Sequence, residues 1–207
     1  MEHHIAIYLA GSIKKDHEKS DDSFWSDKEM YDLKSLLAPH EVSFLNPAFR
    51  GDDLSDQCSV FGRDMLQVFS CDFVFVDVRE RRGLGVGAEM MWAKLNKIPV
   101  IALAPKNSHY HKSETTVLET PVKDWVHPFV ESLSDKIVET LAEGAAWILE
   151  ALSDPSITIK DMEFIEAAMC YYKKHQLKHD APMQEILSFS PTVNNRIRYL
   201  STPPLVL

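Results

Sequence analysis

Short apolar runs alternate with amphipathic segments along the first half of the chain. Runs rich in Val, Ile and Phe, which are typical of buried strands, cover residues 5–10, 42–45, 73–78 and 98–104. Hydrophobic residues at three- and four-residue spacing predict helices between them, at 24–37, at 60–70 and around Glu89. This alternating order predicts an α/β protein with an open, doubly wound parallel sheet of four to five strands.

The pattern weakens after Pro105. Residues 106–120 are polar and predict a loop, and 122–126 predict a fifth strand at the sheet edge. Apolar residues at helical spacing predict one long helix over 129–152 and a second over 161–176. We therefore expect an α/β domain over 1–126 and a helical extension over 127–207, which packs on that domain or on a partner subunit.

Three alternate glycines follow the most apolar predicted strand. Gly83, Gly85 and Gly87 lie in the stretch RGLGVGAEMMWA, and Glu89 follows them in a mostly apolar helical opening. Glycine lets backbone approach a ligand closely, and amides at a helix start favour negative groups. An unpaired buried carboxylate is costly, so Glu89 is a candidate functional residue. The alternative is that Glu89 stabilises the dipole of its own helix.

Composition and charge exclude several classes of function. The formal charge of −9 argues against a nucleic acid polymer as partner, because phosphate contacts need clustered Lys and Arg. No apolar run approaches the roughly 20 residues that cross a bilayer, so we expect no membrane association and a cytoplasmic protein. Three cysteines without metal-like spacing fit a reducing compartment, and we expect neither a metal nor a cofactor.

Ligands of open α/β sheets bind beyond the carboxyl ends of the strands. Here those ends carry residues 8–15, 77–89 and 104–107, and Asp64 precedes the third strand closely enough to face the same edge. A pair of carboxylates is what cleavage of a glycosidic bond requires, since one attacks the anomeric carbon and the other protonates the leaving group. Asp77 at the end of its strand is a candidate ribose contact.

A dinucleotide-binding turn is a competing interpretation, because Gly83 and Gly85 match part of G-x-G-x-x-G. The third glycine position is Ala88, however, and the turn follows the third predicted strand instead of the first. A flavin or dinucleotide protein is therefore the weaker alternative.

The segment IYLAGSI at 7–13, the position of Asp64, and LGVGAE followed by Ala93 together resemble the nucleoside 2-deoxyribosyltransferase family. The similarity is greatest to its hydrolytic branch, the 2′-deoxynucleoside 5′-phosphate N-hydrolases, and it covers about half of the chain. It implies a flavodoxin-like fold, cleavage of an N-glycosidic bond through a covalent deoxyribosyl intermediate, and a homodimer or higher homo-oligomer.

The resemblance also implies roles for individual residues. Glu89 matches the nucleophile, Asp64 the acid that assists the leaving base, and Tyr8 the tyrosine that orients the nucleophile. Residues 11–13 match the turn that lines the sugar and phosphate end, that is Gly11, Ser12 and Ile13, and Lys14 lies where the hydrolase has a basic residue. Gly85 and Gly87 match the glycines whose amides line the pocket. Two departures stand out: Gly83 replaces a phosphate-holding serine, and transferases tend to have an acidic residue that grips the base, near which this chain has Arg81 and Arg82.

These observations lead to one main hypothesis and two alternatives. The main one is hydrolysis of the N-glycosidic bond of a nucleoside or nucleoside 5′-monophosphate, with Arg81, Arg82 and Lys14 compensating for the missing serine. The first alternative is base exchange by a deoxyribosyltransferase. The second is a nucleotide-binding or sensing module without turnover, since a fold does not fix a function.

Overall fold

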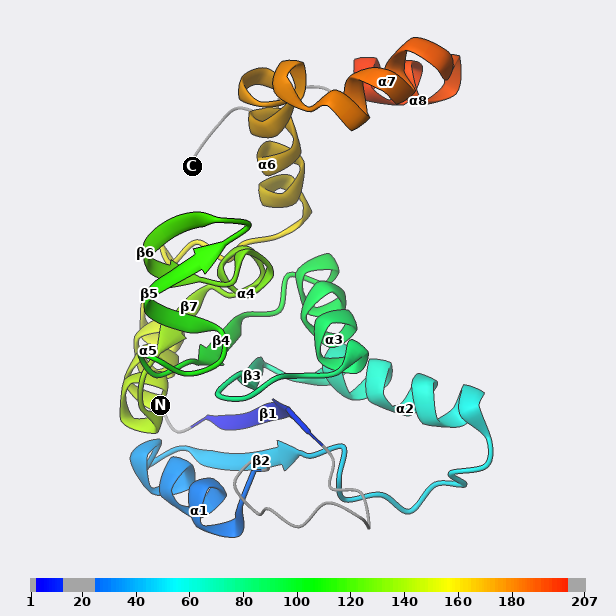
Figure 1. The fold of residues 1–207 in the computed structure, drawn as a ribbon. Helices are drawn as coiled ribbons and strands as arrows, with labels where there is room; N and C mark the ends of the chain where they lie inside the picture. The colour runs from blue at the N-terminus through cyan, green and yellow to red at the C-terminus, as the bar shows by residue number, and fades with distance from the viewer. Residues whose placement is uncertain (1–2, 13–24, 201–207) are drawn as a thin grey trace. The chain divides into compact units, whose positions relative to one another are not determined.

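The computed structural model describes residues 3–12 and 25–200 and divides the chain into two compact units, 1–159 and 160–207. The first unit is an α/β domain (Figure 1). Its strands and helices in chain order are β1 His4–Ala10, α1 Asp27–Leu36, β2 Glu41–Leu45, α2 Gln57–Ser70, β3 Phe73–Asp77, α3 Leu84–Leu95, β4 Val100–Leu103, β5 His111–Val117, β6 Thr120–Val126, α4 Pro128–Leu133, β7 Lys136–Val138 and α5 Leu141–Ser153.

The central sheet confirms the predicted fold class. Its five strands are all parallel and lie in the order β2-β1-β3-β4-β7, which is the flavodoxin-like order. Every residue of β3 and β4 is buried. This burial explains why these strands read as continuous apolar runs, because helices cover both of their faces.

Helices form one layer on each face of the sheet. Helices α1 and α5 contact each other on one face, and α2 and α3 contact each other on the other face (Figure 1). Side chains alternate between faces along β1, so Ile7 and Leu9 join the core under α1 and α5. Tyr8, between them in sequence, points to the face of α2 and α3, where it bonds a residue of α3. The alternation of β1 therefore directs Tyr8 toward the candidate site.

The segment after β4 differs from its prediction. Residues 122–126 do not extend the main sheet as a fifth strand, because β6 pairs with β5 in an antiparallel hairpin. The fifth strand of the main sheet is β7. Part of the segment expected to be a polar loop forms β5, which is polar except for its last residue, Val117, and has no buried residue.

The predicted long helix over 129–152 is also wrong. The chain forms α4, then β7, then α5, so the predicted helix is interrupted by a strand. The break lies at Ser134 and Asp135: Asp135 accepts a 2.7 Å hydrogen bond from the backbone N–H of Val100 and pairs with buried Lys94. These contacts fix the start of β7 beside β4. Residues 127–159, expected in the helical extension, thus belong to the first compact unit.

The second compact unit is helical. Helix α6, Met162–His175, agrees with the predicted helix over 161–176, and η1 Leu177–His179, α7 Ala181–Phe189 and α8 Pro191–Tyr199 follow it. Pro182 and Pro191 lie in the first turns of α7 and α8, where proline lacks only an N–H that would be unpaired anyway. Asp180 and Ser190 cap α7 and α8 through their side chains.

None of the helices in the described ranges has the length and apolar character needed to cross a membrane.

Candidate functional site

A hydrogen bond between Tyr8 and Glu89 joins β1 to α3. The Tyr8 hydroxyl donates to Glu89 Oε1 at 2.9 Å, and Tyr8 is fully buried while Glu89 is 8% exposed. The other carboxylate oxygen, Oε2, is buried and accepts no hydrogen bond from any described residue. One oxygen of the carboxylate is therefore held in place, and the second has an unused accepting capacity.

Burial dominates the electrostatics of this pair. It raises the pKa of Glu89 to about 7, the Tyr8 hydrogen bond opposes that rise, and the charge of Asp64 adds to it. Burial, reinforced by the charge of Glu89, raises the pKa of Tyr8. The hydroxyl therefore stays protonated and can donate its hydrogen bond to Glu89. Glu89 therefore changes protonation near neutral pH, as do many carboxylates of catalytic sites.

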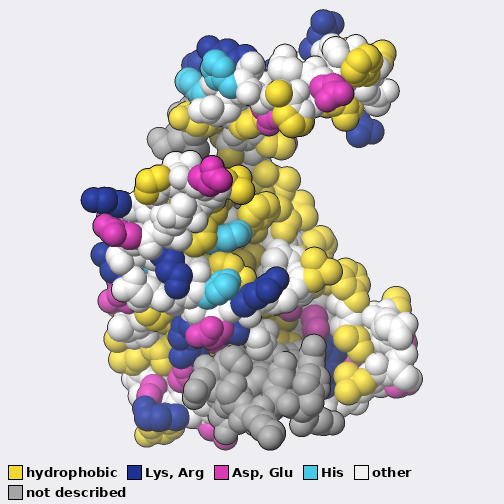
Figure 2. Space-filling view, viewed as in Figure 1, with side chains coloured by type: hydrophobic (Ala, Val, Ile, Leu, Met, Phe, Trp, Pro, Cys, Tyr) yellow, Lys and Arg dark blue, Asp and Glu magenta, His cyan; other side chains and the backbone are white. Residues whose placement is uncertain are grey.

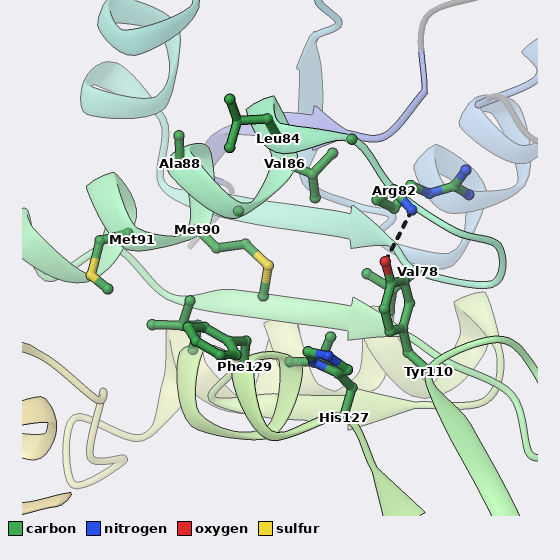
Figure 3. A pocket seen from close by; sticks show the side chains of 14 residues that line it. Val78, Arg82, Leu84, Val86, Ala88, Met90, Met91, Tyr110, His127 and Phe129 are labelled. Carbon is green, nitrogen blue, oxygen red and sulfur yellow. Dashed lines mark hydrogen bonds between the residues drawn. The ribbon is translucent and has the colours of Figure 1, made fainter. Parts of the chain in front are cut away.

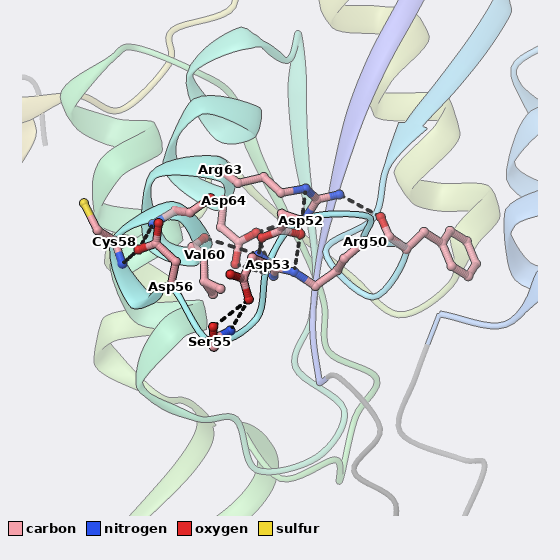
Figure 4. A network of polar contacts seen from close by, with 11 residues as sticks. Arg50, Asp52, Asp53, Ser55, Asp56, Cys58, Val60, Arg63 and Asp64 are labelled. Carbon is pink, nitrogen blue, oxygen red and sulfur yellow. Dashed lines mark hydrogen bonds and ion pairs between the residues drawn. The ribbon is translucent and has the colours of Figure 1, made fainter.

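Asp64 lies on α2 in a network of ion pairs (Figure 4). Arg50, in the loop between β2 and α2, donates from Nη1 to both oxygens of Asp64 at 3.1 Å. Arg63 donates to Asp64 Oδ1 at 3.3 Å, and Arg50 also binds Asp52 through two nitrogens. The charge of Asp64 reaches both Glu89 and Tyr8, so the predicted trio lies in one electrostatic neighbourhood.

The contacts of Asp64 bear on its predicted role as an acid. A carboxylate has about four accepting positions, and guanidinium groups only donate. Three N–H···O contacts, two to Oδ1 and one to Oδ2, already occupy Asp64. In this arrangement Asp64 acts as an acceptor, with one remaining position on Oδ2. Transfer of a proton from Asp64 to a leaving base stays a prediction.

Asp77 ends β3 and is fully buried among arginines. Its Oδ1 accepts from the backbone N–H and Nε of Arg79 at 3.0 and 2.9 Å, and Arg82 Nη2 lies 2.6 Å from its Oδ2. Arg82 is itself 4% exposed in its side chain and donates to Ser12 Oγ at 2.9 Å. These contacts tie Arg82 to the protein, which makes it a poor replacement for the missing phosphate-binding serine.

The turn after β1 lies at the same edge of the sheet. A Cβ added to Gly11 would lie 3.4 Å from the Trp25 ring and 3.7 Å from Asp77, so the backbone here passes close to both side chains. Ser12 accepts the hydrogen bond from Arg82 described above. Ile13 and Lys14, the other predicted pocket residues of this turn, lie outside the described residues. The expected meeting of β1 and β3 ends is thus present for Gly11, Ser12 and Asp77.

The three glycines at the start of α3 have different surroundings. Gly83 caps the helix with an extended backbone, and no described glycine has a positive φ, so left-handed conformations do not explain this motif. A Cβ added to Gly85 would lie 3.9 Å from Glu89 Oε1, whereas one on Gly83 or Gly87 would meet nothing within 4 Å. Gly85 is therefore the glycine adjacent to the candidate nucleophile.

A cavity of about 380 Å³ lies on another face of α3 (Figure 3). Gly83, Gly87 and Arg82 border it, and neither Tyr8, Asp64 nor Glu89 does. Its apolar walls come from α3 and α4, and two aromatic side chains of the hairpin region, Tyr110 and His127, close one end. The residues whose side chains form most of its walls are Val78, Leu84, Val86, Met90, Met91, Phe129, Val130 and Leu133.

Sequence reasoning missed Arg50 and Arg63. Neither belongs to an apolar period or a glycine motif, and Arg50 lies in a polar loop between two predicted elements. The signal available was an excess of Asp in residues 52–56 next to Asp64, because buried carboxylates need cationic partners. The described residues contain no group of three or more His, Cys, Asp or Glu side chains arranged to hold a metal ion.

No protein-family model and no curated protein sequence matches this chain. Among solved structures it is similar to one described as the CMP N-glycosidase BcmB of Clostridium botulinum, at 17% sequence identity and a TM-score of 0.38. The similarity covers 69% of this chain and 97% of that chain.

Proposed function

We propose that this protein cleaves the N-glycosidic bond of a nucleoside or a nucleoside 5′-monophosphate, with Glu89 as the nucleophile. The observation that carries the proposal is the Glu89 carboxylate: Tyr8 holds Oε1 at 2.9 Å, and the buried Oε2 has no hydrogen bond from a described residue. A nucleophilic carboxylate needs this combination, because one oxygen must be fixed while the other attacks.

In the proposed first step, Oε2 of ionised Glu89 forms a bond to C1′ of the sugar as the bond from C1′ to the base breaks. The electron pair of the broken bond leaves with the base, and a covalent glycosyl-enzyme remains. Water then adds its OH to C1′, releases Glu89 and supplies the proton that the free base gains. The Tyr8 hydroxyl stays hydrogen-bonded to Oε1 and keeps the carboxylate in line throughout.

We favour water over a second base as the acceptor of the sugar. The family resemblance leads one to expect an acidic residue that grips the base in transferases, and this chain has Arg81 and Arg82 nearby. Arg82 is bound to Asp77 and Ser12, so it does not take over that role. Base exchange remains the alternative outcome, recognised by transfer of the sugar to an added free base.

The test is release of free base from a panel of ribo- and deoxyribonucleosides and their 5′-monophosphates, followed by chromatography. We expect release from at least one substrate and a loss of at least about 1,000-fold in Glu89→Gln, because the nucleophile is removed. Glu150→Gln, an exposed change on α5 in the opposite helix layer, is the matched control. Trapping of a sugar on Glu89 with a slow substrate, located by mass spectrometry, would establish the intermediate.

Two results would overturn this proposal. One is release of base by Glu89→Gln at the rate of the unchanged protein. The other is thermal stabilisation by a nucleotide without any product, which would favour a nucleotide-binding module instead.

We also propose that copies of the chain associate through the outer surface of α2 and α3. Large apolar side chains are exposed there, and Figure 2 shows hydrophobic groups at the surface over α3. The most exposed members on these two helices are Phe61, Leu66, Phe69 and Leu84. Sedimentation velocity should show a dimer or larger species that Leu66→Lys converts to monomer; a monomeric unchanged protein would contradict the proposal.

A further inference from the structure

The two arginines beside Asp64 differ in how many of their N–H groups are already used. We propose that Arg63 binds the leaving base and stabilises the negative charge that develops on it, while Arg50 only positions Asp64. This inference rests on the proposed function and assigns to Arg63 the assistance that the sequence predicted for Asp64. It follows from the hydrogen bonds of the two guanidinium groups and from the location of Arg63.

Every nitrogen of the Arg50 guanidinium is already hydrogen-bonded. A guanidinium carries five N–H groups, and Arg50 makes five hydrogen bonds. It makes two to Asp52, two to Asp64 and one to the Val60 carbonyl. Its side chain is 9% exposed, so it links the loop after β2 to α2 from a buried position. Arg50 is therefore a positioning residue.

Arg63 has donors to spare. Of its five N–H groups, one donates to Asp64 and one to the Phe49 carbonyl at 2.7 Å. Its Nε lies 3.7 Å from Asp52, which is an ion pair without a hydrogen bond. Three N–H groups thus have no hydrogen bond to the residues that the structure describes. The side chain is 22% exposed, so a ligand can reach them.

The location of Arg63 is suited to the leaving group. Burial is the main cause of the raised Tyr8 pKa, and the charges of Glu89, Asp64 and Arg63 all act on that hydroxyl as well. Arg63 therefore lies within electrostatic reach of the Tyr8 hydroxyl, which holds Glu89 Oε1. It also contacts Asp64, the residue that the family resemblance places on the side of the leaving base.

The chemistry matches these donors. When the bond from C1′ to nitrogen breaks, its electron pair spreads over the base onto the acceptor beside that nitrogen, which is O2 of a pyrimidine or N3 of a purine. An N–H of Arg63 aimed at this acceptor binds more strongly as the charge grows, which lowers the barrier. Asp64 then needs no proton of its own. The base leaves as an anion and takes its proton from the water that resolves the intermediate.

The experiment compares two leaving groups on the same sugar. One substrate is the best nucleoside or nucleotide of the panel, and the other is the 4-nitrophenyl glycoside of its sugar, whose phenolate needs little assistance. We expect Arg63→Gln to lower kcat/KM about 100-fold for the natural base and less than about five-fold for the nitrophenyl substrate. Arg63→Lys, which keeps the charge, should recover part of the loss.

Arg50→Gln is the matched comparison. A positioning role predicts losses of similar size on both substrates, because a displaced Asp64 and loop disturb the site whatever the leaving group. Equal losses on both substrates for Arg63→Gln, or no loss on the natural base, would overturn the assignment of Arg63. Thermal unfolding of each variant separates these results from loss of fold. Glu89→Gln must be inactive on both substrates, so survival of its activity identifies a failure of the proposed function itself.

Discussion

Two buried carboxylates, Asp77 and Glu89, lie in the same α/β domain in opposite environments. Asp77 is fully buried and in contact with Arg79 and Arg82, and Arg79 alone gives it hydrogen bonds at 3.0 and 2.9 Å. Glu89 has one neutral partner, the Tyr8 hydroxyl. Burial without a cation raises the pKa of Glu89 to about 7.

The comparison shows how one domain can use the same chemical group for structure and for chemistry. A carboxylate that is surrounded by guanidinium groups has its accepting positions filled, and the fold depends on it because its removal leaves buried cations unpaired. A carboxylate that is buried with an unused oxygen is costly to the fold and is available to react. The number of cationic partners, and not burial alone, separates the two.

The largest effect is expected for Asp77→Asn. Removing this charge leaves buried Arg82 without its anionic partner and leaves Arg79 with Glu29 alone, and breaking a buried pair from one side costs about 3–5 kcal/mol. Urea unfolding should show the free energy of unfolding lowered by that amount. A loss below about 1 kcal/mol would contradict the structural role given to Asp77.

Glu89→Gln should raise the free energy of unfolding, whereas Asp77→Asn lowers it. The folded pKa of about 7 lies above the ordinary value of 4.5, so the folded state binds more protons than the unfolded state between these values. The unchanged protein therefore loses stability as pH rises through this window. We expect Glu89→Gln to be more stable by about 3 kcal/mol above pH 7, with the difference fading toward pH 4.5.

The measurement for that prediction is urea unfolding of both proteins at pH 5 and at pH 8. An advantage of the variant that does not grow with pH would show that Glu89 is not buried as a charge.

The pH dependence of turnover sharpens the same comparison. Because the ionised form of Glu89 attacks, kcat/KM should rise with pH through about 7. Tyr8→Phe removes the hydrogen bond that lowers the Glu89 pKa. The rise of kcat/KM with pH should therefore move to higher pH by about one unit. Activity that falls with pH through the same range would reverse the assignment of Glu89.

The smallest effect is expected for Gly87→Ala. Gly87 is exposed within α3 and an added Cβ meets nothing within 4 Å, so alanine should stabilise the helix by about 1 kcal/mol. Thermal unfolding measures this gain. Loss of base release despite the gain in stability would support the predicted contact of Gly87 with the ligand.

The sequence predicted the central sheet because its strands are buried on both faces. Burial selects continuous Val, Ile and Phe runs, which are readable without partners, as in β3 and β4. The segment after Pro105 was harder to predict. The apolar residues of α4, β7 and α5 together recur at the three- and four-residue spacing of a single helix. Only the pairing of β7 with β4 and the contacts of Asp135 distinguish these alternatives.

In the candidate site, too, some features follow from the sequence and others only from tertiary contacts. The sequence by itself determined that Tyr8, Asp64 and Glu89 are polar groups at positions where strands and helices meet the predicted ligand edge. Only the tertiary structure decided which cations lie beside them: Arg50 and Arg63 reach Asp64, and no Arg or Lys among the described residues pairs with Glu89. The physical reason is that a carboxylate's reactivity depends on charges brought near it through space, and sequence spacing does not encode those distances.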